Sequence, residues 1–147
     1  EPILNLKKNN KESSKKIIDK LFSKKNWPII HYGETEKIAI IYLAEKFNYN
    51  LEEIALLKAR FIDLHILIRE SWILPIKNYS LKTVANFTGF EWEQKEVSGS
   101  KALYWWIQYE ISKKDVFLEK IIKYNHDDCI ATLHITKWLF KNKLKTN

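Results

Sequence analysis

Residues 124–129 read Tyr-Asn-His-Asp-Asp-Cys, and they lie in a longer segment, 115–142, whose pattern predicts one amphipathic helix. Its apolar and aromatic residues recur at steps of three and four, which places them on one face. That face consists of Phe117, Ile121, Tyr124, Asp128, Ala131, Ile135 and Trp138. A carboxylate on a core-facing stripe is costly unless something compensates its charge. A bound metal ion is one such compensation, so Asp128 is the first candidate for a functional residue.

The same stretch has a second interpretation, a break between two helices. Asn125, Asp127 and Asp128 are all good N-cap residues, so one helix could end near Tyr124 and another could begin after it. If the helix is continuous, Tyr124 precedes Asp128 by four residues on the same face. The hydroxyl and the carboxylate could then orient a water molecule together, and an ordinary core tyrosine is the alternative.

The composition bounds the class of protein. A length of 147 residues fits one domain with a real core, and only three Gly and three Pro favour long helices. The single cysteine, Cys129, excludes an internal disulfide framework, so we expect a reducing, cytoplasmic location. No apolar run approaches the length of a membrane span, so no membrane partner is expected.

The charge balance points to a polyanionic partner. The chain carries 25 Lys and Arg against 18 Asp and Glu, a formal net charge of +7, and such an excess favours nucleic acid. Only Arg60 and Arg69 are arginines. An AT-rich genome would also produce so many lysines, so this explanation stays open.

We expect a single helix-rich α/β domain over residues 1–147, with residues 1–10 loosely ordered and a basic tail at 141–147. Helices are predicted over residues 12–24, 34–47, 51–58, 80–88, 101–112 and 115–142. A short buried strand is predicted over 28–32, a strand that runs into a helix over 61–68, and an exposed acidic loop over 91–100. The chain contains no Met and hence no initiator, so we expect a fragment of a longer protein.

A second carboxylate repeats the anomaly of Asp128. Glu36, Ile40, Leu43 and Phe47 fall at steps of four, three and four, again on one helix face. Glu36 also follows the predicted strand at 28–32, and α/β proteins place active groups where a strand leads into a helix. The plainer alternative is that Glu36 complements the helix dipole.

An ordered set of short motifs runs through the chain. Its members are Ile30-His31-Tyr32-Gly33, Glu36, Asp63-Leu64, and residues 79–85, 89–92, 98–100 and 124–132. Over residues 28–140 this set resembles the RNase H-like nucleases often called predicted RecB-family nucleases, within the DEDD (DnaQ-like) exonuclease group. The resemblance implies a ribonuclease H-like fold and phosphodiester hydrolysis with two divalent cations, Mg²⁺ or Mn²⁺, usually from a 3′ end.

The resemblance also implies roles for particular residues. Glu36 matches the metal carboxylate of the second motif, and Asp128 matches that of the third motif. Tyr124 matches the tyrosine that orients the attacking water, so these three residues are the expected catalytic set. Asp127 belongs to the third motif and is a further candidate metal ligand. Hard cations prefer such clustered oxygen ligands.

Supporting and binding roles follow from the same resemblance. Asp63 and His31 match positions that support the site, and Lys82 falls where a family lysine approaches the phosphates. The implied partner is nucleic acid, with DNA ahead of RNA, and a fused or associated helicase.

One departure from the family pattern limits these expectations. The first motif of the group, an Asp-x-Glu on an early strand, supplies two of its four carboxylates, and nothing before Trp27 matches it. We therefore expect the fold to be incomplete at its N-terminal strands, and this piece to bind metal weakly and cleave poorly. Three functions stay open. The chain is the nuclease domain of a longer protein, a degenerate RNase H-like module that only binds nucleic acid or scaffolds a larger machine, or an α-helical protein-interaction domain with no nucleic-acid role.

Overall fold

The computed structural model describes residues 10–93 and 98–143. These residues divide into two compact units, which we call unit 1 (within residues 1–70) and unit 2 (within residues 71–147), and each is described by itself. Of the two ends predicted to be loosely ordered or basic, residues 1–9 and 144–147 lie outside the described residues. Residues 141–143 continue the last helix.

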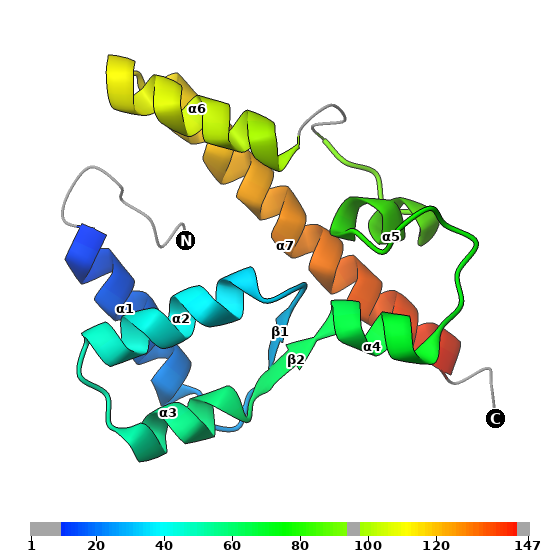
Figure 1. Ribbon diagram of the computed structural model, residues 1–147, viewed down its shortest axis with the longest axis horizontal. Helices are drawn as coiled ribbons and strands as arrows, with labels where there is room; N and C mark the ends of the chain where they lie inside the picture. Colours follow the sequence, from blue (N-terminus) through cyan, green and yellow to red (C-terminus); the bar gives the residue numbers. More distant parts are fainter. Residues whose placement is uncertain (1–9, 94–97, 144–147) are drawn as a thin grey trace. The chain divides into compact units, whose positions relative to one another are not determined.

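Unit 1 is built from short helices and one small parallel sheet (Figure 1). Its elements in chain order are α1 (Asn10–Ser23), β1 (Ile29–His31), α2 (Thr35–Lys46), α3 (Leu51–Lys58), β2 (Phe61–Asp63) and α4 (Leu64–Ser71). β1 and β2 pair in parallel with His31 opposite Asp63. Parallel strands need a crossover connection, and α2 and α3 supply it. The predicted helix-rich α/β class and the strand that runs into a helix are confirmed.

Local sequence signals set these elements. The Asn50 side chain accepts the Glu53 backbone N–H at 2.8 Å while Glu53 accepts the Asn50 N–H at 3.0 Å, a reciprocal cap that begins α3. Arg60 donates to the carbonyls of Leu21 and Trp27 at 2.8 and 2.9 Å. The start of β2 is thereby held against the segment before β1. The buried core of unit 1 comprises Ile18, Ala44, Ile54 and Leu57.

Unit 2 consists of α5 (Leu81–Phe87), α6 (Gly99–Ser112) and α7 (Asp115–Lys143), and both shorter helices pack against α7 (Figure 1). Ser80 caps α5 as predicted, since its hydroxyl accepts the Thr83 N–H at 3.3 Å. The next turn is left-handed at Gly89, with φ of +89°. His134 on α7 then donates from Nε2 to the Thr88 carbonyl at 3.0 Å, which fixes the end of α5 to α7.

α7 is one continuous helix of 29 residues. The alternative interpretation of residues 124–129 as a break between two helices is therefore wrong. The exposed acidic loop predicted over 91–100 is also wrong in one respect: Trp92 is buried, and its ring packs edge-on against Phe90 with centroids 5.1 Å apart. Residues 94–97 of that loop lie outside the described residues. The strand at 29–31 is only partly buried, because Ile30 is exposed.

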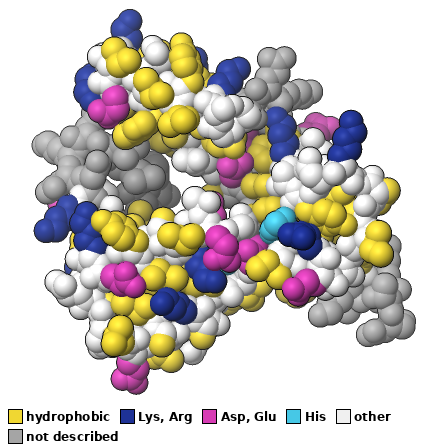
Figure 2. All heavy atoms as spheres, viewed as in Figure 1, with side chains coloured by type: hydrophobic (Ala, Val, Ile, Leu, Met, Phe, Trp, Pro, Cys, Tyr) yellow, Lys and Arg dark blue, Asp and Glu magenta, His cyan; other side chains and the backbone are white. Residues whose placement is uncertain are grey.

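The surface shows no segregation of charge on the face drawn in Figure 2, where basic and acidic side chains are interspersed with hydrophobic ones. The net charge of +7 is thus not gathered into a single basic stripe on that face. None of the helices in the described ranges combines the length and the apolar character needed to cross a membrane.

Candidate functional site

Asp63 ends β2, and its carboxylate is held by the backbone on both sides. Oδ1 accepts the Gly33 N–H at 3.0 Å and the His65 N–H at 2.8 Å. The first bond holds the turn after β1, and the second satisfies a donor in the first turn of α4. Two charge-assisted hydrogen bonds compensate a partly buried carboxylate well. Asp63 therefore joins the ends of both strands of the sheet.

His31 and Tyr32 surround the same turn. His31 is buried, donates from Nδ1 to the Gly33 carbonyl at 2.6 Å, and contacts the Phe61 ring edge-on at 5.4 Å. Burial raises the pKa of Tyr32 to about 12, and the negative charge of Asp63 adds to that shift. His31 thus stabilises the turn that Asp63 holds, which is compatible with a supporting role.

Glu36 lies in the first turn of α2, where its side chain is exposed. The expectation that it faces the core is wrong: α2 buries only Ala44 completely, and its other apolar residues are exposed or half-buried. The face that carries Ile40, Leu43 and Phe47 does pack against the core of unit 1, but Glu36, in the first turn of the helix, is exposed. Its position at the helix N-terminus suits the plainer role of complementing the helix dipole.

Tyr124 and Asp128 form a pair on α7, as their spacing predicts. The Tyr124 hydroxyl donates a hydrogen bond to the Asp128 carboxylate. Burial, then the charge of Asp128 and this hydrogen bond, raise the pKa of Tyr124 above its ordinary value. The hydroxyl therefore stays protonated at neutral pH. It can donate and accept hydrogen bonds there, and it cannot act as a general base.

Asp127 is the most buried carboxylate of this turn, with a relative exposure of 4%. Asp128 is half-buried, as are Phe117, Ile121, Tyr124 and Trp138 of the predicted stripe, whereas its neighbour Asp127 is buried. Asp127 lies four residues and Asp128 three residues before Ala131, so both carboxylates belong to the face that Ala131 and Ile135 bury. The sequence pattern admits both carboxylates, since steps of three and four alternate along a helix.

One oxygen of Asp127 has no hydrogen-bond partner. Asp127 Oδ2 and Trp92 Nε1 are the buried side-chain polar atoms without a partner within residues 10–93 and 98–143. The other oxygen, Oδ1, lies 3.9 Å from Nδ1 of His126, whose side chain is largely exposed. A buried carboxylate oxygen without a donor costs free energy, so its persistence requires a partner from outside the chain or a nearby charge.

Lys123 supplies part of that charge. Its Nζ lies 2.9 Å from Glu93 Oε2, and the pKa of Lys123 is raised by Glu93 first, with a smaller contribution from the charge of Asp127. The pair is exposed and contributes little to stability. It does bring the segment after Phe90 to this turn of α7, and it leaves Asp127 Oδ2 without a donor.

The donor set suits a hard divalent cation. Asp127 and Asp128 offer carboxylate oxygens on adjacent positions of one helix, and one of these oxygens is buried and unpaired. Within each unit, the described residues contain no cluster of three or more His, Cys, Asp or Glu side chains able to hold a metal. Mg²⁺ is nevertheless commonly held by one or two carboxylates, with water and substrate phosphate completing its shell. The residues of unit 2 fit that mode.

Lys82 lies on α5 in unit 2, with Nζ 6.0 Å from the centre of the Trp92 ring. Residues 71–147 thus contain Lys82, Tyr124, Asp127 and Asp128, while His31, Glu36 and Asp63 belong to unit 1. Trp92 belongs to the motif at residues 89–92, but the sequence predicts no role for it and places it in an exposed loop. Phe90 and Trp92 flank Glu91 directly after Gly89, and this aromatic pair was the available signal for a packed segment.

Comparison with known families places this geometry in context. A family model described as the RNase H superfamily matches residues 3–140, which spans both units. No curated protein and no solved structure matches the chain significantly. This match supports a nuclease-type activity on nucleic acid, and it extends over nearly the whole sequence. The chain belongs to the RNase H superfamily.

Proposed function

We propose that this chain is a nuclease domain that hydrolyses phosphodiester bonds of nucleic acid with the help of divalent cations. One observation carries the proposal: a single turn of α7 holds the hydrogen-bonded pair of Tyr124 and Asp128 beside Asp127, whose buried Oδ2 is unpaired. Membership of the RNase H superfamily supports the reaction class. The resemblance to DEDD exonucleases supports a finer version, hydrolysis from a 3′ end with two ions, Mg²⁺ or Mn²⁺.

Asp127 and Asp128 would hold the cation through carboxylate oxygens. A cation held there would supply positive charge to the phosphate oxygens and help to activate the attacking water. Tyr124 would orient both the Asp128 carboxylate and the attacking water. Its O–H donates a hydrogen bond to the carboxylate, and its oxygen would accept one from the water. Because its pKa is raised, the tyrosine performs this task as a neutral group.

Four further residues predicted from the sequence are also given roles in the proposed function. Glu36 is proposed as a further metal carboxylate, with Asp63 and His31 holding the strand ends from which α2 begins. Lys82 is proposed to contact the phosphates of the substrate. DNA is the preferred substrate over RNA, and a fused or associated helicase is the proposed partner; both rest on the family resemblance and on the positive net charge.

The decisive experiment compares variants in an active preparation of the protein on 3′-labelled single-stranded DNA with Mn²⁺. Asp128→Asn is expected to lower the cleavage rate at least about 100-fold, because removing a metal ligand costs several kcal/mol of transition-state stabilisation. Tyr124→Phe is expected to lower it roughly 10-fold, the loss of one oriented hydrogen bond. Glu119→Gln, an exposed carboxylate on the same helix, is the matched control and should cleave normally.

Equal cleavage by the Asp128→Asn variant and the unmodified protein would remove Asp128 from the site. If no preparation cleaves, but oligonucleotide binding persists and weakens with salt, the chain is the degenerate binding module. Glu36→Gln in the same assay tests Glu36 independently: unchanged cleavage assigns that residue to the helix dipole alone.

A further inference from the structure

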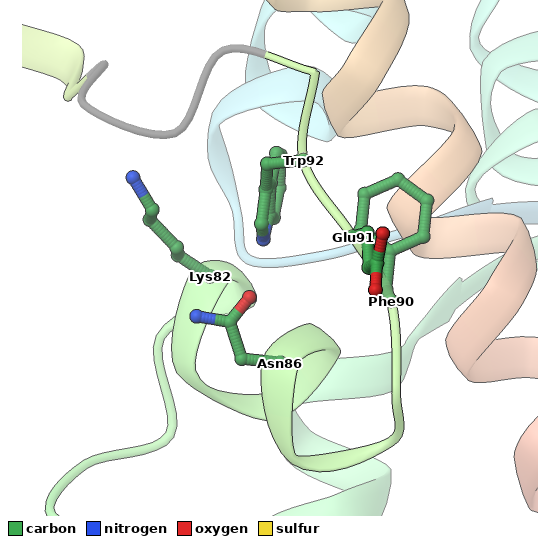
Figure 3. Close-up of a pocket in the computed structure, with 5 residues that line it drawn as sticks. All are labelled: Lys82, Asn86, Phe90, Glu91 and Trp92. Carbon is green, nitrogen blue, oxygen red and sulfur yellow. The ribbon is translucent and has the colours of Figure 1, made fainter.

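We propose that a pocket in unit 2, between α5 and the segment that follows it, binds a single nucleobase. The choice of a nucleobase as the ligand rests on the proposed function, because the substrate of a nuclease domain contains nucleobases. The pocket has a volume of about 300 Å³ and is lined by Lys82, Asn86, Phe90, Glu91 and Trp92 (Figure 3). That volume suits one nucleotide rather than a duplex.

The pocket contains a hydrogen-bond donor without a partner. Trp92 is 8% exposed, and its Nε1–H is one of the two buried side-chain polar atoms without a partner in the described ranges. In Figure 3 the nitrogen of the ring is turned toward α5, the helix that contributes Lys82 and Asn86. A buried indole N–H almost always has an acceptor. An acceptor from a bound molecule would satisfy it.

Aromatic and polar side chains surround that donor. Phe90 and Trp92 provide aromatic surfaces, and base–aromatic stacking is a general mode of binding unpaired nucleotides. Asn86 is exposed and carries both a donor and an acceptor, as recognition of a base edge requires. A planar ring with acceptors at its edge therefore matches the wall of the pocket.

The pocket is lined by one positive and one negative side chain. Lys82 and Glu91 lie at opposite sides of the pocket in Figure 3. Lys82 attracts a phosphate, whereas Glu91 repels one and can accept hydrogen bonds from an amino or hydroxyl group. A nucleotide is thus bound in one orientation, with its phosphate toward Lys82. The pocket and the carboxylates of α7 belong to the same unit.

The test uses the full chain in EDTA, so that metal binding plays no part. The indole N–H signals are followed by NMR while the four common nucleoside monophosphates are added, and Trp92→Phe identifies the signal of Trp92. We expect that signal to shift, with a dissociation constant on the order of 1 mM for one stacked and hydrogen-bonded base. Ribose 5-phosphate, which lacks a base, should leave it unmoved. Trp106→Phe, which removes an exposed indole on α6, should not alter the titration.

Two further variants test the roles separately. Asn86→Ala changes an exposed residue and so keeps the fold; it should weaken binding roughly 5- to 10-fold, the value of one hydrogen bond. Lys82→Gln should weaken the binding of nucleotides but not of nucleosides, and Lys101→Gln, an exposed lysine on α6, should change neither. If no nucleotide shifts the Trp92 signal, or if ribose 5-phosphate shifts it equally, the pocket does not bind a nucleobase. Trp92 Nε1 would then have a water molecule as its hydrogen-bond partner.

The results distinguish a failure of the nucleobase pocket from a failure of the proposed nuclease function. An unmoved Trp92 signal together with loss of cleavage by Asp128→Asn removes the pocket and retains the nuclease. A shifted signal together with cleavage that does not depend on Asp128 retains the pocket and removes the proposed metal site.

Discussion

Asp63 and Asp127 are both shielded carboxylates, and the two units of the chain treat them in opposite ways. In unit 1, Asp63 accepts two backbone N–H groups, from Gly33 and His65. In unit 2, Asp127 is more deeply buried, yet Oδ2 has no donor. A carboxylate with internal donors is explained by the fold that it holds together. A carboxylate that the fold leaves unpaired is explained better by a ligand, and this difference separates structural acids from functional ones.

The largest expected effect is on the stability of unit 1. Asp63→Ala leaves two backbone N–H groups without their acceptor, so the free energy of unfolding should fall by about 2–4 kcal/mol. Urea unfolding followed by circular dichroism measures it, with Glu45→Ala, an exposed residue of α2, as control. A loss no larger than that of the control would break the comparison, since Asp63 would then be as dispensable as an unpaired acid.

The second effect has the opposite sign. Asp127→Asn removes a buried charge that Lys123 compensates only in part, so without metal the protein should become more stable by about 1 kcal/mol. Saturating Mn²⁺ should stabilise the unmodified protein by roughly 1–3 kcal/mol, and the variant should lose this gain. Thermal unfolding with and without Mn²⁺ provides both values. Strong destabilisation by Asp127→Asn in EDTA would show that Asp127 is a structural acid like Asp63.

The third effect concerns the ionisation of Tyr124. Asp128→Asn removes the negative charge and the charged acceptor beside the hydroxyl, so the pKa of Tyr124 should fall toward its ordinary value. Burial is the larger cause of the shift and remains, so the fall is partial. Difference absorbance of tyrosinate during an alkaline titration, with Tyr124→Phe to assign the signal, follows it. An unchanged titration would mean that the two side chains do not pair in solution.

The smallest effect is confined to alkaline pH. The pKa of Tyr32 is about 12 in the folded chain, above the unfolded value of about 10, so the neutral hydroxyl is favoured by folding. Its contribution is complete below about pH 10 and is lost as the pH rises through about 12. The stability difference between the unmodified protein and Tyr32→Phe should be constant below this window and shrink within it. Urea unfolding across the window tests the sign, and a difference that grows with pH contradicts it.

The sequence predicted the helices well because their signals are local. The Ser80 cap, the turn at Gly89 and the long apolar repeat of α7 each act within a few residues of the chain. The pairing of Tyr124 with Asp128 was predictable for the same reason, since four residues make about one helical turn.

Burial was harder to predict because it depends on packing between distant segments. Glu36 and Asp128 each lie on an apolar stripe by sequence, yet Glu36 is exposed and Asp127 is the buried acid. Neighbouring side chains point about 100° apart around a helix, so adjacent carboxylates can differ in burial: Asp127 is buried and Asp128 is half-buried. The burial of Trp92 depends on its contact with Phe90 and on the neighbouring helices, and the sequence of the loop alone does not predict that packing.

The continuity of α7 has a mechanical consequence. At 29 residues it is about 43 Å long, and an unbroken α-helix bends only gently over such a span. The turn with Tyr124 and Asp128 is therefore rigidly coupled to Trp138, whose ring contacts Trp72 at 5.2 Å. A displacement at one end of such a helix is transmitted along it. The part of the tryptophan fluorescence that Trp138→Phe removes can thus serve as a remote probe of movement at the carboxylates.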